Sequence, residues 1–209
     1  MSRNEHLSKL VCGALAAVLA VALAPGVQAG SLGPRPRATS KKPRGKYPYL
    51  GSPRAKVTME VFGDFQCPWT QRLAPTLLQI TKAYPRKVKI VWRDFPLRFH
   101  RRAMPAAIAA REVFRQRGTK GFIIIATQIF NHNRNLTDQN LLLWAGQAGA
   151  DTAKVSNALK TNKHQAAIQS EMKRAQARGV RGTPTILFNG LPYKGQRTLS
   201  AFRQTIDAL

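Results

Sequence analysis

The stretch Phe62–Thr70 constrains the fold of this chain more than any other part of the sequence. It begins at the end of the segment Val57–Phe62. That segment is rich in β-branched and aromatic residues and predicts a buried strand. Pro68 suits the first position of a helix, and apolar residues then recur at helical spacing as far as Ile80. The sequence therefore places Cys67 where a strand has ended and a helix begins.

A cysteine at the start of a helix has a physical reason to be reactive. The first N–H groups of a helix have no partner within it, and the positive end of the helix dipole favours an anion. The thiolate is the nucleophilic form of cysteine. We therefore expect Cys67 to be an accessible thiol that ionises more readily than an ordinary cysteine.

The rest of the chain alternates predicted strands and helices, which indicates an α/β fold. A second strand is expected at Val88–Asp94, and Thr185–Phe188 is expected to pair, through an Asn189-Gly190 turn, with Leu191–Lys194. The residue types of Phe122–Phe130 favour a strand, but the spacing of its apolar residues favours a helix. We interpret the segment as helix. The other helices are expected at residues 68–83, 103–114, 137–148, 151–159, 163–178 and 199–209.

Two motifs resemble those of the DsbA-like thioredoxin-fold proteins. The letters DFQCPWT at residues 64–70 are similar to the family pattern D-F-Q-C-P-x-C. Gly182-Thr183-Pro184-Thr185 resembles the family's loop with a cis-proline, which lies beside the active cysteine. The resemblance covers roughly residues 56–209 and implies a thioredoxin fold, in which a mixed central sheet is flanked by helices. It also implies an inserted helical subdomain at about residues 101–178.

The resemblance also implies the roles of particular residues. Cys67 would be the nucleophile, and Pro68, Trp69, Thr183 and Pro184 would contact an extended polypeptide substrate. The substrates would be protein thiols or disulfides. No histidine has ligand-like spacing, so we expect neither a metal nor another cofactor.

Two departures from the family pattern bear on the mechanism. Thr70 stands where the family has its second, resolving cysteine. A hydroxyl cannot form a disulfide, although it can donate a hydrogen bond to the thiolate of Cys67. Many members also carry a buried acid six residues before the first cysteine, and that position is Val61 here, with Glu60 expected on the other strand face. Cys67 could still attack a partner disulfide, but release of the resulting mixed disulfide would need an external thiol reductant.

The first 29 residues have the pattern of a secretory signal peptide. Arg3 and Lys9 precede the apolar run Leu10–Ala24, and Val27-Gln28-Ala29 offers a cleavage site after Ala29. The run is shorter than the roughly 20 residues that span a bilayer. Cleavage would remove Cys12 and leave Cys67 as the only cysteine of an exported, periplasmic or otherwise extracytoplasmic protein.

The chain is strongly basic, with a formal charge of +25. Between Gly30 and Lys56 it has eight basic residues, no acid and several prolines and glycines, so residues 30–55 predict a disordered basic arm before a domain at 56–209. The arm is either a solvated tether or a binding segment for an anion. Export argues against nucleic acid and for an anionic envelope polymer or lipid surface.

Three functions agree with these patterns. The first is a thiol–disulfide oxidoreductase of DsbA type, in which Cys67 forms a mixed disulfide or a sulfenic acid that an external thiol resolves. The second is a non-catalytic polypeptide-binding module that keeps the groove beside Pro184, tethered by its basic arm. The third is a basic envelope-surface protein whose domain is only a scaffold. The reactivity of Cys67 separates the first from the other two.

Overall fold

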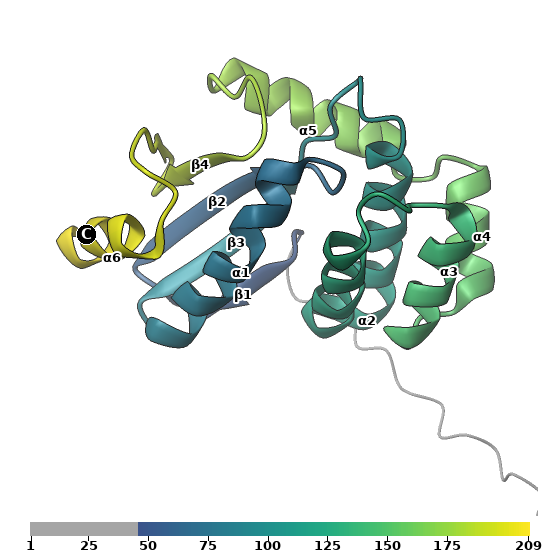
Figure 1. Ribbon diagram of the computed structural model, residues 1–209, viewed down its shortest axis with the longest axis horizontal. Helices are drawn as coiled ribbons and strands as arrows, with labels where there is room; N and C mark the ends of the chain where they lie inside the picture. Colours follow the sequence, from purple (N-terminus) through teal and green to yellow (C-terminus); the bar gives the residue numbers. More distant parts are fainter. Residues whose placement is uncertain (1–45) are drawn as a thin grey trace, which may run out of the picture. The chain divides into compact units, whose positions relative to one another are not determined.

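The computed structural model describes residues 46–209, which form one sheet with helices around it (Figure 1). The predicted signal peptide, its cleavage after Ala29 and residues 30–45 of the predicted arm lie outside the described residues. The strand order is β1-β3-β2-β4-β5. The strands are β1 (Tyr49–Gly51), β2 (Val57–Gly63), β3 (Val88–Asp94), β4 (Thr185–Phe188) and β5 (Leu191–Pro192). The predicted α/β class with a mixed sheet is confirmed.

The parallel pair β2 and β3 lies at the centre of the sheet. Val57 lies opposite Val88 at one end of the pair, and Gly63 lies opposite Asp94 at the other. Helix α1 (Pro68–Ala83) connects the two strands, and all other strand pairs are antiparallel. Since parallel strands end at the same edge of a sheet, the loops that follow β2 and β3 meet there.

Four helices separate β3 from β4 along the chain and form the predicted helical insertion. They are α2 (Ala103–Asn131), α3 (Asp138–Gln147), α4 (Thr152–Lys160) and α5 (Gln165–Ala177), and α6 (Leu199–Ala208) follows β5. Helix α2 packs against both α3 and α4. Figure 1 shows these three helices grouped on one side of the sheet, while α5 runs back toward β4.

Helix α2 contains a break at Gly118. This residue has φ 64° and ψ −160°, a conformation that glycine adopts readily and other residues rarely do. The break divides α2 into residues 103–117 and 119–131. The ambiguous segment Phe122–Phe130 lies in the second part, so its interpretation as helix is confirmed.

The strand β1 corrects the predicted boundary of the basic arm. Tyr49–Gly51 lies within the range predicted to be disordered, yet it pairs with β3 in the sheet. The main-chain N–H of Trp92 also donates to the carbonyl of Pro48 at 3.0 Å. The strand depends on hydrogen bonds from β3, a partner that the composition of residues 30–55 does not reveal. The predicted last strand is also shorter than expected, since β5 ends at Pro192.

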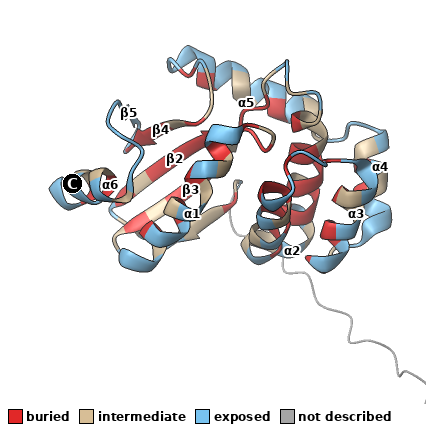
Figure 2. Ribbon diagram, in the orientation of Figure 1, coloured by how far each residue is buried: buried red, intermediate tan, exposed pale blue. Residues whose placement is uncertain are grey.

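An aromatic cluster joins the sheet to the helical insertion. The ring of Phe65 lies 5.0 Å from the ring centroid of Trp92 on β3, and 5.2 Å from that of Phe130 on α2. Phe65 is almost fully buried. Figure 2 shows buried residues concentrated along β2, β3 and α2. The loop between β2 and α1 is therefore held in the core by Phe65, two residues before Cys67.

Gly63 is a buried position with no room for a side chain. A Cβ atom at this residue would lie 2.2 Å from the indole ring of Trp92, far inside normal contact distance. We expect Gly63→Ala to lower the free energy of unfolding by about 1–3 kcal/mol, because overpacking forces buried atoms to move. Chemical denaturation measures this change. Gly182→Ala, where no atom lies within 4 Å of the added Cβ, is the control, and equal stability of the two variants would contradict the prediction.

Candidate active site

The structure places Cys67 at the N-cap of α1, with Pro68 as the first helical residue. This agrees with the position predicted from the sequence. Its Sγ lies 3.4 Å from the main-chain oxygen of Thr183, to which the thiol donates a hydrogen bond. The Thr183–Pro184 peptide bond is cis. The two motifs, more than a hundred residues apart in the sequence, thus lie in contact in the folded chain.

The expectation of an accessible thiol is wrong for this conformation. Cys67 is only 3% exposed. The cause is the loop at Thr183, whose carbonyl group lies against the sulfur. The position of this loop relative to α1 depends on the packing of the whole sheet, so the local sequence around Cys67 does not reveal it.

Thr70 lies on the first turn of α1 and is 1% exposed. The expected hydrogen bond from its hydroxyl to the sulfur of Cys67 is not made, and Thr70 Oγ1 has no hydrogen-bond partner in the described structure. The thiol instead points to Thr183, whose own hydroxyl is also buried without a partner. The site thus contains two unsatisfied buried hydroxyls, which is unusual in a folded protein.

Pro68 and Trp69 are exposed at the surface beside Cys67, and Trp69 is 61% exposed. The guanidinium of Arg72 lies 4.8 Å from the centre of the Trp69 ring. These two side chains line a cavity of about 340 Å³ with Leu73 and residues 195–197. Trp69 therefore offers a large amphipathic surface next to the thiol, on the side that faces the loop after β5.

Asp64 organises the active-site loop, a role that the sequence analysis did not assign. Its Oδ1 accepts hydrogen bonds from the main-chain N–H groups of Gln66 at 2.7 Å and Cys67 at 3.2 Å. Its Oδ2 accepts one from the N–H of Leu97 at 2.8 Å and lies 2.8 Å from Nδ1 of His100. The bond from the N–H of Gln66, two residues on, is an Asx turn, which aspartate forms readily in loops. Asp64 joins the loops that follow β2 and β3.

The comparison with known sequences agrees with this geometry. The sequence model of the family described as thioredoxin matches residues 44–208, which is most of the chain. The chain belongs to the thioredoxin family. This confirms the family and the fold that the two motifs indicated.

Solved structures of thioredoxin-like proteins share the fold. A thioredoxin-like oxidoreductase from Silicibacter pomeroyi is 25% identical, with a TM-score of 0.67 over 78% of this chain and 91% of the other. Oxidised BdbD from Bacillus subtilis is 22% identical, with a TM-score of 0.70 over 81% of this chain and 96% of the other. The DsbA-type arrangement of a thioredoxin sheet with a helical insertion is therefore present here.

The thioredoxin domain also resembles part of larger proteins. It is 26% identical over 161 residues to the Na(+)/H(+) antiporter NhaA 1 of Mycolicibacterium gilvum. The match covers 76% of this chain but only 26% of the antiporter, so the chain spans about a quarter of that relative's length. Within residues 46–209, no helix has the length and apolar character needed to cross a membrane.

The strand before the active site of this thioredoxin-family chain has no acid directed at Cys67. Val61 is fully buried, while Glu60 pairs with Arg93 at 2.7 Å and with Arg178 at 2.6 Å. Burial opposes ionisation of Glu60, but the two guanidinium groups hold its pKa below its ordinary value. Glu60 is thus committed to an ion-pair cluster and is not a proton carrier for the thiol. Among residues 46–209, no group of three His, Cys, Asp or Glu side chains is arranged to hold a metal ion.

Proposed function

We propose that this protein is an exported thiol–disulfide exchange protein that acts through Cys67 alone. The observation that carries the proposal is the contact between Cys67 at the N-cap of α1 and the Thr183–Pro184 loop. In this place a sulfur at a helix N-terminus lies against a main chain of the kind that can bind an extended polypeptide. The family and the fold support the same class of reaction.

The exchange would proceed in three steps. The thiolate of Cys67 attacks one sulfur of a partner disulfide, the S–S bond of the partner breaks, and its other sulfur leaves as a thiolate that takes up a proton. Cys67 is then joined to the partner by a new disulfide. An external thiolate attacks the Cys67 sulfur, releases the partner as a thiolate, and a second external thiol restores Cys67.

The external thiol is needed because Thr70 cannot resolve the intermediate. Thr70 stands where a second sulfur would attack the mixed disulfide, and its hydroxyl does not react with sulfur in this way. Cys67 is the free cysteine of the described residues, and Cys12 belongs to the proposed signal peptide. The partner should therefore stay attached to Cys67 until an outside thiol arrives.

One observation favours a second candidate, a polypeptide-binding module without catalysis. Cys67 is only 3% exposed, so attack requires the Thr183 loop or the partner to uncover the sulfur. In this second function Trp69 and the main chain of Thr183 would hold an extended segment while Cys67 stays inert. The basic residues before Lys56 would then bind an anionic envelope polymer or lipid surface.

Trapping of partners distinguishes the two functions. The protein and its Cys67→Ser variant are expressed in an exporting bacterium, the cells are quenched with acid, and the proteins are compared on non-reducing gels. We expect adducts with the wild type that disappear on reduction and are absent from Cys67→Ser, because only a sulfur can hold the partner covalently. Identical gels for the two proteins would exclude the exchange function. They would favour the binding module if both proteins still bind an unfolded polypeptide.

A further inference from the structure

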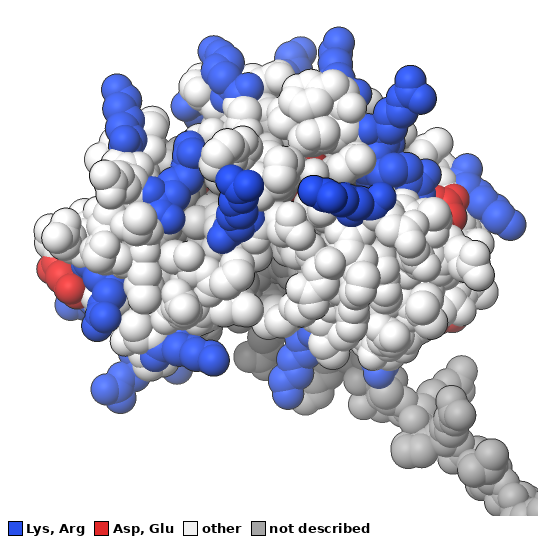
Figure 3. Space-filling view, in the orientation of Figure 1, with Lys and Arg blue, Asp and Glu red and all other residues white. Residues whose placement is uncertain are grey.

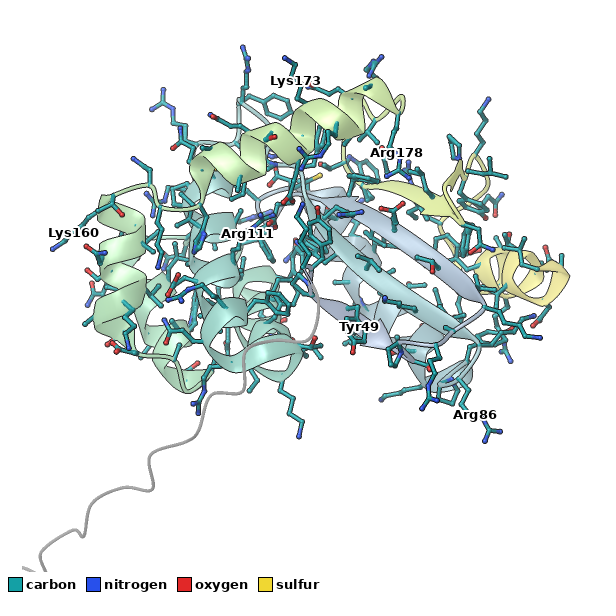
Figure 4. The ribbon with its side chains drawn as sticks, turned by 180° about the vertical axis from the view of Figure 1, so that it is seen from behind. Tyr49, Arg86, Arg111, Lys160, Lys173 and Arg178 are labelled. Carbon is teal, nitrogen blue, oxygen red and sulfur yellow. The ribbon has the colours of Figure 1, made fainter. Side chains whose placement is uncertain are left out.

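A cleft lies next to the active site, between α5 and the loop that joins β3 to α2. Its volume is about 620 Å³. Met104 and Met172 supply apolar surface inside it, and Arg98, Arg101 and Lys173 supply three positive charges around it. Figure 1 shows the loop beside α5, and Figure 4 labels Lys173 on that helix.

The cleft is connected to Cys67 through two hydrogen-bonded groups. His100 lines the cleft, and its Nδ1 lies 2.8 Å from Oδ2 of Asp64. The other oxygen of Asp64 accepts a hydrogen bond from the main-chain N–H of Cys67. A partner polypeptide whose cysteine has reached Cys67 would therefore need only a few further residues to enter the cleft.

The three cations of the cleft have no acidic partner among residues 46–209. Arg98, Arg101 and Lys173 are exposed and take part in none of the ion pairs of that part of the chain. No Asp or Glu lines the cleft. Figure 3 shows Lys and Arg side chains along the margin of the surface near α5, with few acidic ones among them.

Two arginines near the cleft are instead paired with acids. Arg102 pairs with Asp138, and Arg111 pairs with both Asp94 and Glu171. Arg102 and Arg111 are thus neutralised by acids on neighbouring elements, whereas the three cations of the cleft have no such counter-charge. Unpaired cations beside apolar surface are complementary to an acidic ligand that also carries apolar groups.

We propose that this cleft binds an acidic segment of the partner polypeptide, next to the disulfide that Cys67 attacks. The proposal rests on the exchange function and names its class of substrate: proteins with carboxylates and apolar residues near the reactive cysteine. Methionine side chains adapt to varied apolar groups, so the cleft selects charge more strongly than sequence. The field of the three cations also raises the rate at which acidic partners arrive.

The test measures binding without thiol chemistry. All proteins carry Cys67→Ser, and the probes are a fluorescein-labelled peptide of alternating glutamate and leucine and its counterpart with glutamine in place of glutamate. The test protein has Arg98→Gln, Arg101→Gln and Lys173→Gln. The matched control has Lys82→Gln, Arg86→Gln and Arg203→Gln, which removes the same charge from exposed positions. Lys82 lies near the far end of α1, about 20 Å from Cys67 along the helix axis.

We expect the acidic peptide to bind the test protein about tenfold more weakly than the control in fluorescence anisotropy at physiological salt, the sum of three exposed ion pairs. The glutamine peptide should bind both proteins equally. Equal binding of the acidic peptide to the two proteins would overturn the proposal. Displacement of the acidic peptide by glutarate at equal concentration would also overturn it, by assigning the cleft to small dicarboxylates.

The binding test and the trapping test can fail separately, because binding is measured without the thiol of Cys67. Loss of acidic-peptide binding in the test protein would support the cleft even if no adducts were trapped through Cys67. Trapped adducts without any charge preference would leave exchange intact and refute the cleft as a substrate site.

Discussion

Under the proposed exchange mechanism, Thr70→Cys should let Cys67 release its partner without an external thiol. The variant would carry Cys-Pro-Trp-Cys at residues 67–70, with the new sulfur on the first turn of α1. A thiol on the same helix turn as Cys67 attacks the mixed disulfide within one molecule, which is faster than attack by a dilute external thiol. We expect release of a bound partner to accelerate by about a hundredfold or more.

The structure gives a reason why this substitution should be tolerated. Thr70 is buried, yet its hydroxyl makes no hydrogen bond, so Thr70→Cys breaks no hydrogen bond and removes only one buried methyl group. Cysteine also behaves as a small apolar residue in a buried position. The folded state should therefore lose no more than about 1 kcal/mol, the cost of one buried methyl group, while the chemistry changes.

Titration in a glutathione redox buffer measures the outcome of Thr70→Cys. Alkylation after acid quench should show two thiols under reducing conditions and none under oxidising conditions, and the trapped adducts of the wild type should vanish. Thr70→Ser is the matched control, since it keeps a hydroxyl and should retain the adducts. Failure of the variant to form an internal disulfide in any buffer would show that residues 67 and 70 do not have the geometry of a redox pair.

Glu112→Gln should produce the largest loss of stability among single substitutions of a charged residue outside the active site. The side chain of Glu112 is fully buried in α2. It pairs with Arg115 at 2.6 Å, with Lys163 at 3.1 Å and with His164 at 2.8 Å. Burial opposes its ionisation, but these partners lower its pKa from 4.5 to about 2. That shift corresponds to about 3 kcal/mol in favour of the charged form in the folded state.

The glutamine variant should therefore lose about 3 kcal/mol at neutral pH, because it resembles the protonated side chain. In the wild type, the stability supplied by Glu112 is complete above pH 4.5 and is lost as the pH falls from there toward 2. His164 adds an earlier loss: its burial lowers its pKa below 6.5, so its contribution is present above that pH and declines as the solution becomes more acidic.

Urea denaturation at a series of pH values measures both effects. The wild type and Glu112→Gln should differ most above pH 4.5 and converge in acid. Asp138→Asn is the control, because that carboxylate is 62% exposed and its pair with Arg102 should contribute less than about 1 kcal/mol. A constant difference between the wild type and Glu112→Gln from neutral pH down to pH 3 would show that the stabilisation does not come from the charge.

The sequence was sufficient to predict features that depend on neighbouring residues. The strand that ends at Gly63, the helix that starts at Pro68 and the placement of Cys67 at its N-cap all follow from local patterns. The helix starts predicted at Thr137 and Asp151 are confirmed, since each side chain accepts a hydrogen bond from the main-chain N–H three residues later. Such signals lie within a few residues of the feature that they specify.

The features that could not be predicted depend on distant parts of the chain. The burial of Cys67 depends on Thr183, 116 residues away, and the strand β1 exists only because β3 supplies its partners. The ion pairs that Glu112 forms with Lys163 and His164 could not be predicted either, because the packing of other helices brings these two residues to it. The sequence likewise gave no sign that the hydroxyl of Thr70 would lack a partner.

The sheet described above ends on two very short strands, and this protects the molecule from self-association. An exposed strand edge is a template on which another extended chain can add, which leads to aggregation. Here the outer strands are only three and two residues long: β1 stops at Gly51, with φ 83°, and β5 stops at Pro192, which has no N–H to donate. A protein whose proposed partners are extended polypeptides thereby keeps their main chains away from its sheet edges, which leaves the surface beside Cys67 as the place where they can bind.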